Sequence, residues 1–143
     1  MSNIRPIYET TGTLIAEEEA VARAAAAWQF DYRKLAMKNE IDFALLREDR
    51  VCAWVECKRR YNDIGRYPTF MLSFHKWQAG RRHAIFSGVP FLLLVQWNDG
   101  LYWANTDKVR LSHVGLGGRT DRNDTQDIEP SVFIDIDQFQ RLE

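Results

Sequence analysis

Residues 51–60 read Val51-Cys-Ala-Trp-Val-Glu56-Cys-Lys58-Arg-Arg60, an apolar run that ends in charge. The run has the composition of a β-strand, in which successive side chains point to opposite faces of the sheet. Glu56 and Lys58 therefore share one face, and Val55 and Cys57 share the other. Charges at the end of a half-buried strand are costly unless they are paired or bind a metal. The stretch is a candidate for chemistry, and the alternative is an ordinary ion pair at the edge of a sheet.

A second strand pattern, Glu40-Ile-Asp42-Phe-Ala-Leu-Leu46, precedes this stretch and places Asp42 inside an apolar run. The connection between the two runs, Arg47-Glu-Asp-Arg50, is entirely charged and has the length of a hairpin loop. The sequence therefore predicts two adjacent antiparallel strands on which Asp42 and Glu56 lie side by side.

These two acids and the lysine resemble the active-site motif of the PD-(D/E)XK nuclease superfamily. Ile41-Asp42 matches the "PD" element, with isoleucine in place of the proline, and Glu56-Cys57-Lys58 matches "(D/E)XK". The spacing is similar to that of the small Holliday-junction resolvases and phage-type endonucleases of the superfamily, and the resemblance covers roughly residues 12–103. It implies an α/β fold with a restriction-endonuclease-like core, in which helices flank a mixed central β-sheet in the order α-β-β-β-α-β.

Residues 13–28 predict a helix, because apolar side chains recur at three- and four-residue steps. Glu18 falls on the same stripe as Leu14 and Val21. One explanation is the helix dipole, which favours acids near the start of a helix and suits all three glutamates of this turn. The resemblance implies another explanation, in which the N-terminal helix brings a glutamate to the metal site. Glu18 fits that role by its facing, and Glu19 is the reserve.

Residues 72–87 predict a second helix, which Gly88 and Pro90 end. The resemblance implies that a polar side chain on this helix reaches the site. Gln78 is the first choice and Lys76 the second, although an exposed helical side chain is the ordinary alternative for both.

The remaining strands are expected downstream. Residues 91–97 are the most apolar strand pattern, and Asn98-Asp99-Gly100 is a hairpin turn that leads to a return strand at 101–105. Residues 129–137 alternate like an edge strand. One strand of the implied fold is left unassigned, and residues 31–39 could hold it.

Cations gather between residues 58 and 83, although the formal net charge of the chain is only −1. A local basic face can hold phosphates while the total charge stays near zero. The loop 61–69 interleaves cations with aromatic side chains, as a groove that binds nucleic acid does, and an ordinary surface loop is the alternative. The expected nucleic-acid-binding residues are Arg59, Arg60, Arg66, Lys76, Arg81 and Arg82.

Length and composition set further bounds. The 143 residues suggest a single domain over 1–143. No apolar run is long enough to cross a membrane, and the first residues lack the apolar stretch of a signal peptide. Cys52 and Cys57 are expected as buried small hydrophobes in a reducing compartment, the cytoplasm or, for a phage protein, the host cytoplasm. The aspartates of residues 121–127 lack the terminal glutamate of a calcium loop.

The resemblance implies a Mg²⁺-dependent endonuclease, with Mn²⁺ able to substitute, that hydrolyses DNA phosphodiester bonds. The implied metal ligands are Asp42, Glu56, the backbone carbonyl of Cys57 and Glu18, and the implied catalytic set adds Lys58 and Gln78. A homodimer that cuts branched or junction DNA is expected. The alternatives are a compact site-specific enzyme of the homing or restriction type, and a non-catalytic nucleic-acid-binding module that keeps the fold.

Overall fold

The computed structural model describes residues 11–36, 39–117 and 128–143. In chain order its helices and strands are α1 (Thr11–Trp28), β1 (Asp31–Lys34), β2 (Phe43–Arg47), β3 (Arg50–Arg59), β4 (Thr69–Ser73), α2 (Phe74–Ser87), β5 (Phe91–Trp97), β6 (Gly100–Asn105), β7 (His113–Gly117), β8 (Glu129–Asp135) and β9 (Gln140–Arg141). With β4 set aside, the first six elements follow the predicted α-β-β-β-α-β order. The aspartates of residues 121–127 lie outside the described residues.

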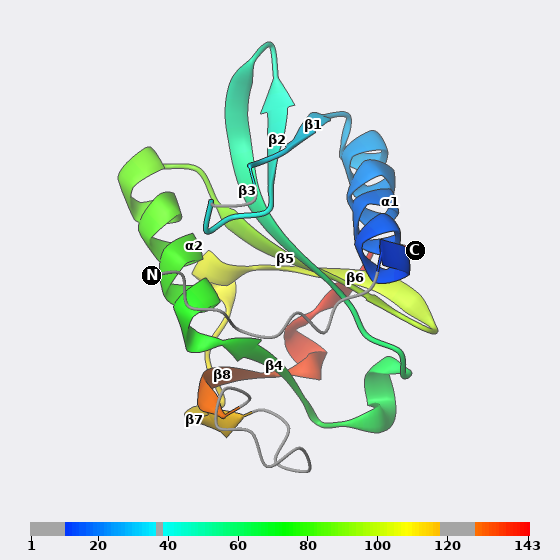
Figure 1. Cartoon of the computed structure of the whole chain (residues 1–143), viewed down its shortest axis with the longest axis vertical. Coiled ribbons are helices and arrows are strands. Elements are labelled where there is room, and N and C mark those ends of the chain that lie inside the picture. Colours follow the sequence, from blue (N-terminus) through cyan, green and yellow to red (C-terminus); the bar gives the residue numbers. More distant parts are fainter. Residues whose placement is uncertain (1–10, 37–38, 118–127) are drawn as a thin grey trace.

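The central sheet has six strands in the order β1-β2-β3-β5-β6-β9. β3 and β5 run parallel and the other neighbouring pairs run antiparallel, so the sheet is mixed. α1 and α2 lie on either side of it (Figure 1). Alternate residues of β5 confirm this, because Leu94 packs in the cluster that contains α1, whereas Leu93 and Val95 pack in the cluster that contains α2. The predicted fold class is confirmed.

Small side chains let both helices approach the sheet closely. On α1 the buried stripe runs through Ala20, Val21 and Ala24, which are at most 1% exposed. On α2 a Cβ added at Gly80 would lie 2.0 Å from the Phe91 ring, so only glycine fits there. Gly88 ends α2 as predicted, with φ of 77° and an N–H that donates to the Ala84 carbonyl.

The β2–β3 hairpin sets the register on which the site depends. Its turn residues Glu48 and Asp49 have φ of 53° and 61°, which suits a two-residue hairpin turn. Phe43 pairs with Val55, so Asp42 and Glu56, the next residues outward, stand opposite each other. The predicted hairpin is confirmed, although β2 begins at Phe43 rather than at Glu40.

A second sheet, with the order β4-β8-β7, lies on the α2 side of the molecule (Figure 1). The prediction for this segment was wrong: residues 69–73 form a strand, where the sequence predicted the end of a loop and the start of a helix. β8 is the middle strand of this sheet and not an edge strand. Phe70 and Leu72 of β4 and Val132 of β8 face the core, and this pairing between distant segments holds β4 in an extended form. The missing strand of the central sheet is β1, within the predicted range 31–39.

Candidate active site

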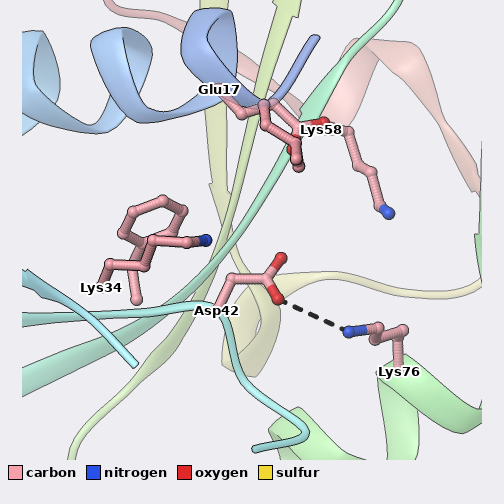
Figure 2. Close-up of a pocket in the computed structure, with 7 residues that line it drawn as sticks. Glu17, Lys34, Asp42, Lys58 and Lys76 are labelled. Carbon is pink, nitrogen blue, oxygen red and sulfur yellow. Dashed lines mark ion pairs between the residues drawn. The ribbon is translucent and has the colours of Figure 1, made fainter. Parts of the chain in front are cut away.

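Charged side chains from five elements, or from positions next to them, converge on one pocket (Figure 2). The segments are the first turns of α1, the end of β3, the start of α2, and the neighbouring ends of β1 and β2. The lining residues are Leu14, Glu17, Lys34, Asp42, Phe43, Lys58 and Lys76. Two carboxylates and three ammonium groups therefore share one small concavity.

Glu56 lies behind the residues that line the pocket and is 1% exposed. Neither of its carboxylate oxygens accepts a hydrogen bond from any group in the described part of the chain. Lys58 Nζ is 3.4 Å from Glu56 Oε2, and Lys76 Nζ is 3.8 Å from Glu56 Oε1. Lys76 Nζ is also 3.6 Å from Asp42 Oδ1 (Figure 2). The expectation that Asp42, Glu56 and Lys58 gather in one place is met by the geometry.

The ionisation of Glu56 reflects this setting. Burial raises the pKa of the Glu56 carboxyl from 4.5 to about 7; Lys58 opposes the rise, the Asp42 carboxylate adds to it, and Lys76 lowers it. Two acids that face each other cannot both ionise cheaply in a buried place. Ionised Glu56 is therefore unfavourable in this setting, and a proton or a cation offsets that cost.

The glutamate that α1 brings to the pocket is Glu17 rather than Glu18. Glu17 is 6% exposed, and its Oε2 accepts the backbone N–H of Arg59 at 3.1 Å. Glu18 instead accepts a hydrogen bond from the Tyr32 hydroxyl at 3.2 Å. The facing of Glu18 was predicted from Leu14 and Val21, but only Val21 is buried; Leu14 is 45% exposed, so the two do not mark one buried face.

The reserve choice fails as well, because Glu19 is exposed. The buried stripe of α1 contains Ala20, Val21 and Ala24, and the position one turn before Ala20 and Val21 is Glu17. The small residues of α1 therefore mark its buried stripe, and that stripe identifies Glu17 as the glutamate that faces inward.

On α2 the side chain at the pocket is Lys76, the second choice, whereas Gln78 is exposed and does not line it. Lys76 Nζ also donates to the Glu40 carbonyl at 3.3 Å. The first turn of α2 turns Lys76 toward the strands and Gln78 toward solvent, so the structure does not bring Gln78 to the acids.

Three of the predicted nucleic-acid-binding cations follow β3. The Arg59 guanidinium donates to Asn98 Oδ1 at 2.9 Å. Arg60 donates to the Met71 carbonyl at 2.9 Å. Arg66 is exposed and lies 5.2 Å from the centre of the Tyr67 ring. Arg59 and Arg60 thus have structural partners, and Arg66 extends from an exposed loop.

Two of the three cations predicted on α2, Arg81 and Arg82, form ion pairs within the chain. Arg81 donates to Thr106 Oγ1 at 3.0 Å and pairs with Asp107. Arg82 makes two hydrogen bonds of 3.0 Å to the carboxylate of Glu40. Both guanidinium groups are therefore occupied within the protein, which was not foreseen from the sequence.

The acids fit a divalent cation only in part. Among residues 11–36, 39–117 and 128–143, no three His, Cys, Asp or Glu side chains lie close enough together to form a metal site by themselves. The Glu56 oxygens are nevertheless buried without hydrogen bonds, and Asp42 faces them at the pocket. Hard oxygen donors of this kind suit Mg²⁺, which completes its octahedron with water and substrate oxygens. The Cys57 thiol points to the α1 side, where it donates to the Glu17 carbonyl at 3.4 Å, so only its backbone could serve the ion.

A mixed sheet between two helices, with one acid in β3, a second just before β2 and a lysine beside them, defines the class: a nuclease of the PD-(D/E)XK type. The family described as "Phage putative PDDEXK endonuclease" matches residues 3–142, and the chain belongs to that family. The predicted superfamily is thereby confirmed. No curated protein matches the chain.

Among solved structures, the chain is similar to Hjc, a Holliday junction resolvase from the archaeal hyperthermophile Archaeoglobus fulgidus. The two share a TM-score of 0.57 at 12% sequence identity, over 89% of this chain and 92% of that chain. At this identity the likeness is one of fold. None of the helices in the described ranges is long and apolar enough to span a membrane.

Proposed function

We propose that the chain is a divalent-metal-dependent endonuclease that hydrolyses phosphodiester bonds in DNA. The observation that carries the proposal is the Glu56 carboxylate, which is buried without a hydrogen bond beside Asp42 and Lys58. A purely structural acid at this depth would be expected to have its oxygens satisfied. Membership of an endonuclease family supports the same conclusion.

Asp42 and Glu56 are the proposed ligands of Mg²⁺ or Mn²⁺, with the backbone carbonyl of Cys57 as a third oxygen. Glu17 takes the role that the resemblance implied for Glu18, and it lines the same pocket as Asp42. A bound divalent ion lowers the pKa of a water and offsets charge on the phosphate. Glu17 and Asp42 both line the pocket that a phosphate must enter, so their carboxylates would orient the attacking water.

The lysines act on the phosphate. Lys58 lies at the end of β3 with 20% of its side chain exposed, so its ammonium group can contact both Glu56 and an incoming phosphate oxygen. Lys76 takes the place expected of Gln78 and bridges Asp42 and Glu56. Its ammonium group offsets part of the negative charge of this acid pair, and it is available to the scissile phosphate.

The proposed substrate is branched or junction DNA, and a homodimer is the proposed acting unit. The fold likeness to Hjc, which is a Holliday junction resolvase, supports this choice. A compact site-specific endonuclease would instead cut one duplex sequence and ignore its shape.

The test is cleavage of a four-way junction, a linear duplex and a plasmid, with Mg²⁺, with Mn²⁺ and with EDTA. We expect metal-dependent cleavage with a preference for the junction, and a loss of about 100-fold or more in Glu56→Gln and Asp42→Asn. The matched control is Glu19→Gln, an exposed acid on the same helix turn as Glu17.

A chain that binds these DNAs but cuts none of them, with the wild type and Glu56→Gln equally inert, would contradict the proposal. The result would instead identify a binding module that has kept the nuclease fold. Cleavage of one duplex sequence in preference to the junction would contradict the substrate assignment alone.

A further inference from the structure

A tyrosine in the connection after β3 presents a fixed and open ring next to the candidate active site. Residues 60–68 join β3 to β4 and include Tyr61 and Tyr67, which are 63% and 56% exposed. Single exposed aromatic side chains are ordinary on protein surfaces, so exposure alone carries no weight. Tyr61 differs because contacts at two points fix it in place.

The first contact is the Arg59 guanidinium, which lies 4.2 Å from the centre of the Tyr61 ring. The second joins the Tyr61 hydroxyl to Thr13 Oγ1 at 2.9 Å. Arg59 is itself held by Asn98 Oδ1 and the Gln96 carbonyl, at 2.9 and 3.2 Å. Since Arg59 covers one face and 63% of the residue remains exposed, the ring offers its other side to solvent. The ring is already held in one orientation before any ligand binds, so binding costs less side-chain conformational entropy.

The backbone of the connection is anchored as well. The Asn62 carbonyl accepts the Asn98 N–H at 3.0 Å, and the Ile64 N–H donates to Asp99 Oδ1 at 3.0 Å. These bonds tie the segment to the turn between β5 and β6. The ring is therefore carried by a rigid element rather than by a loose loop.

Tyr61 is connected to the pocket from two directions. Its partner Thr13 precedes Leu14, which lines the pocket. Its other partner, Arg59, follows Lys58, and the Arg59 N–H donates to Glu17. Figure 1 shows the connection leaving β3 on the side of the molecule where α1 begins. A nucleic-acid strand whose phosphate enters the pocket would pass this ring.

We propose that the Tyr61 ring is a stacking platform for an unpaired DNA base beside the scissile phosphate. The substrate class that follows is DNA with single-stranded nucleotides at the cleavage point, such as a branch or a flap. A base inside a duplex is covered by its neighbours on both faces, so only an unpaired base can offer a face to Tyr61. Aromatic faces next to cations are the usual means of holding single strands. The inference rests on the proposed function, because it places the base next to the phosphate that is cut.

The test measures binding in EDTA, where no cleavage occurs. Fluorescein-labelled single strand, flapped duplex and blunt duplex are titrated with the full chain. We expect Tyr61→Leu to raise the Kd for the single strand and the flap about 10-fold, and to leave the Kd for the blunt duplex within about 2-fold. Tyr61→Phe keeps the ring and stays near the wild type. The control is Phe86→Leu, which removes an 86% exposed ring on α2 and leaves all three affinities unchanged.

A direct readout of stacking comes from 2-aminopurine in the single-stranded arm of the flap. The wild type and Tyr61→Phe quench its fluorescence, and Tyr61→Leu does not. If the wild type gives no quenching, the platform is overturned, whether or not the variants fold. Equal weakening of single strand and blunt duplex in a folded Tyr61→Leu, as judged by circular dichroism, overturns it too.

The two proposals can fail separately. The protein could bind single strands selectively through Tyr61 and yet cleave no DNA with any metal. That result would support the stacking platform and contradict the nuclease proposal. Cleavage that depends on Glu56, with unchanged single-strand affinity in Tyr61→Leu, would end the platform alone.

Discussion

The carboxylate of Glu56 lies where the ionised form of an acid is energetically unfavourable. It is 1% exposed, and the nearest ammonium groups, of Lys58 and Lys76, lie at 3.4 and 3.8 Å without hydrogen-bonding its oxygens. Burying a charge is costly unless pairing and hydrogen bonds compensate for it. The residue therefore weakens the fold in its ionised form, and a proton or a cation relieves that cost.

This cost predicts a pH-dependent stability. The pKa of Glu56 is about 7 in the folded chain against 4.5 as its ordinary value, so the folded state binds more protons between these pH values. The free energy of unfolding therefore falls as pH rises from 4.5 to 7 and is flat above, by about 3 kcal/mol in all. Urea unfolding in EDTA should show Glu56→Gln more stable than the wild type at about pH 8 and equal to it near pH 4.5. A difference between the two that does not change with pH would contradict this.

The neighbouring glutamates of α1 allow a paired test of facing. Glu17 is buried against the Arg59 backbone at the pocket, whereas Glu18 bonds to Tyr32 away from it. We expect Glu17→Gln to lower cleavage by about 10- to 100-fold and Glu18→Gln to leave it within about 3-fold. Single-turnover rates on one junction substrate measure both. A larger loss in Glu18→Gln would return the role to Glu18.

At the scale of elements, α2 does more than cover the sheet, because it also holds the segment that carries Asp42. Arg82 bonds the Glu40 carboxylate twice, and Lys76 bonds the Glu40 carbonyl. Asp42 lies just outside β2, where its carbonyl accepts the Leu35 N–H at 2.8 Å. The position of Asp42 therefore depends on α2 as well as on the neighbouring strand.

This arrangement predicts that Arg82 positions Asp42 and does not bind DNA. Arg82→Gln should lower cleavage by about 10- to 100-fold while the slope of log Kd against log salt stays the same. Glu40→Gln should behave alike, because it breaks the same pair. Arg66→Gln is the contrast, since loss of an exposed phosphate contact reduces the slope by about one. A reduced slope in Arg82→Gln would make Arg82 a phosphate contact, as its position in the sequence suggested.

The strands around the motif could be predicted because their signals are local. Period-two alternation in residues 51–60 and a short charged turn indicate the hairpin. Its exact register was not predictable in this way, because a regular ladder from the Arg47–Arg50 pair would set Asp42 opposite Val55, and the register shift between Leu45 and Leu46 brings Asp42 opposite Glu56 instead. Gly88 is a local signal as well, and it marks the end of α2 since a left-handed residue is needed there.

The features that the sequence did not reveal depend on distant partners. β4 is extended because it pairs with β8, and the residues on either side of 69–73 in the sequence give no sign of that pairing. Glu17 and Glu18 differ by one position; the small residues of α1 point to Glu17, and the packing of α1 against β3 is what buries it. The cations on α2 look alike in the sequence, yet Arg81 forms an ion pair with Asp107 and Arg82 forms one with Glu40.

At the scale of the whole molecule, the proposed site is a single Asp42–Glu56 pair, which would hold one scissile phosphate at a time. The two strands of a duplex or junction run antiparallel and are related by a two-fold axis, so two copies of one chain can present their pockets to both strands. Single chains would instead cut the strands in separate encounters. The two schemes differ in the products of a plasmid that extrudes a junction.

We therefore expect wild-type protein to convert such a plasmid directly to the linear form. Adding an excess of Glu56→Gln chains should shift the product to nicked circles, because most wild-type chains then share a dimer with an inactive one. An inactive competitor for independent monomers would slow the reaction but leave the ratio of nicked to linear product unchanged at an equal extent of plasmid conversion. The ratio, read from agarose gels at early times, thus separates the two schemes even if the dimer is too weak to survive gel filtration, because it reports which chains act together on the DNA.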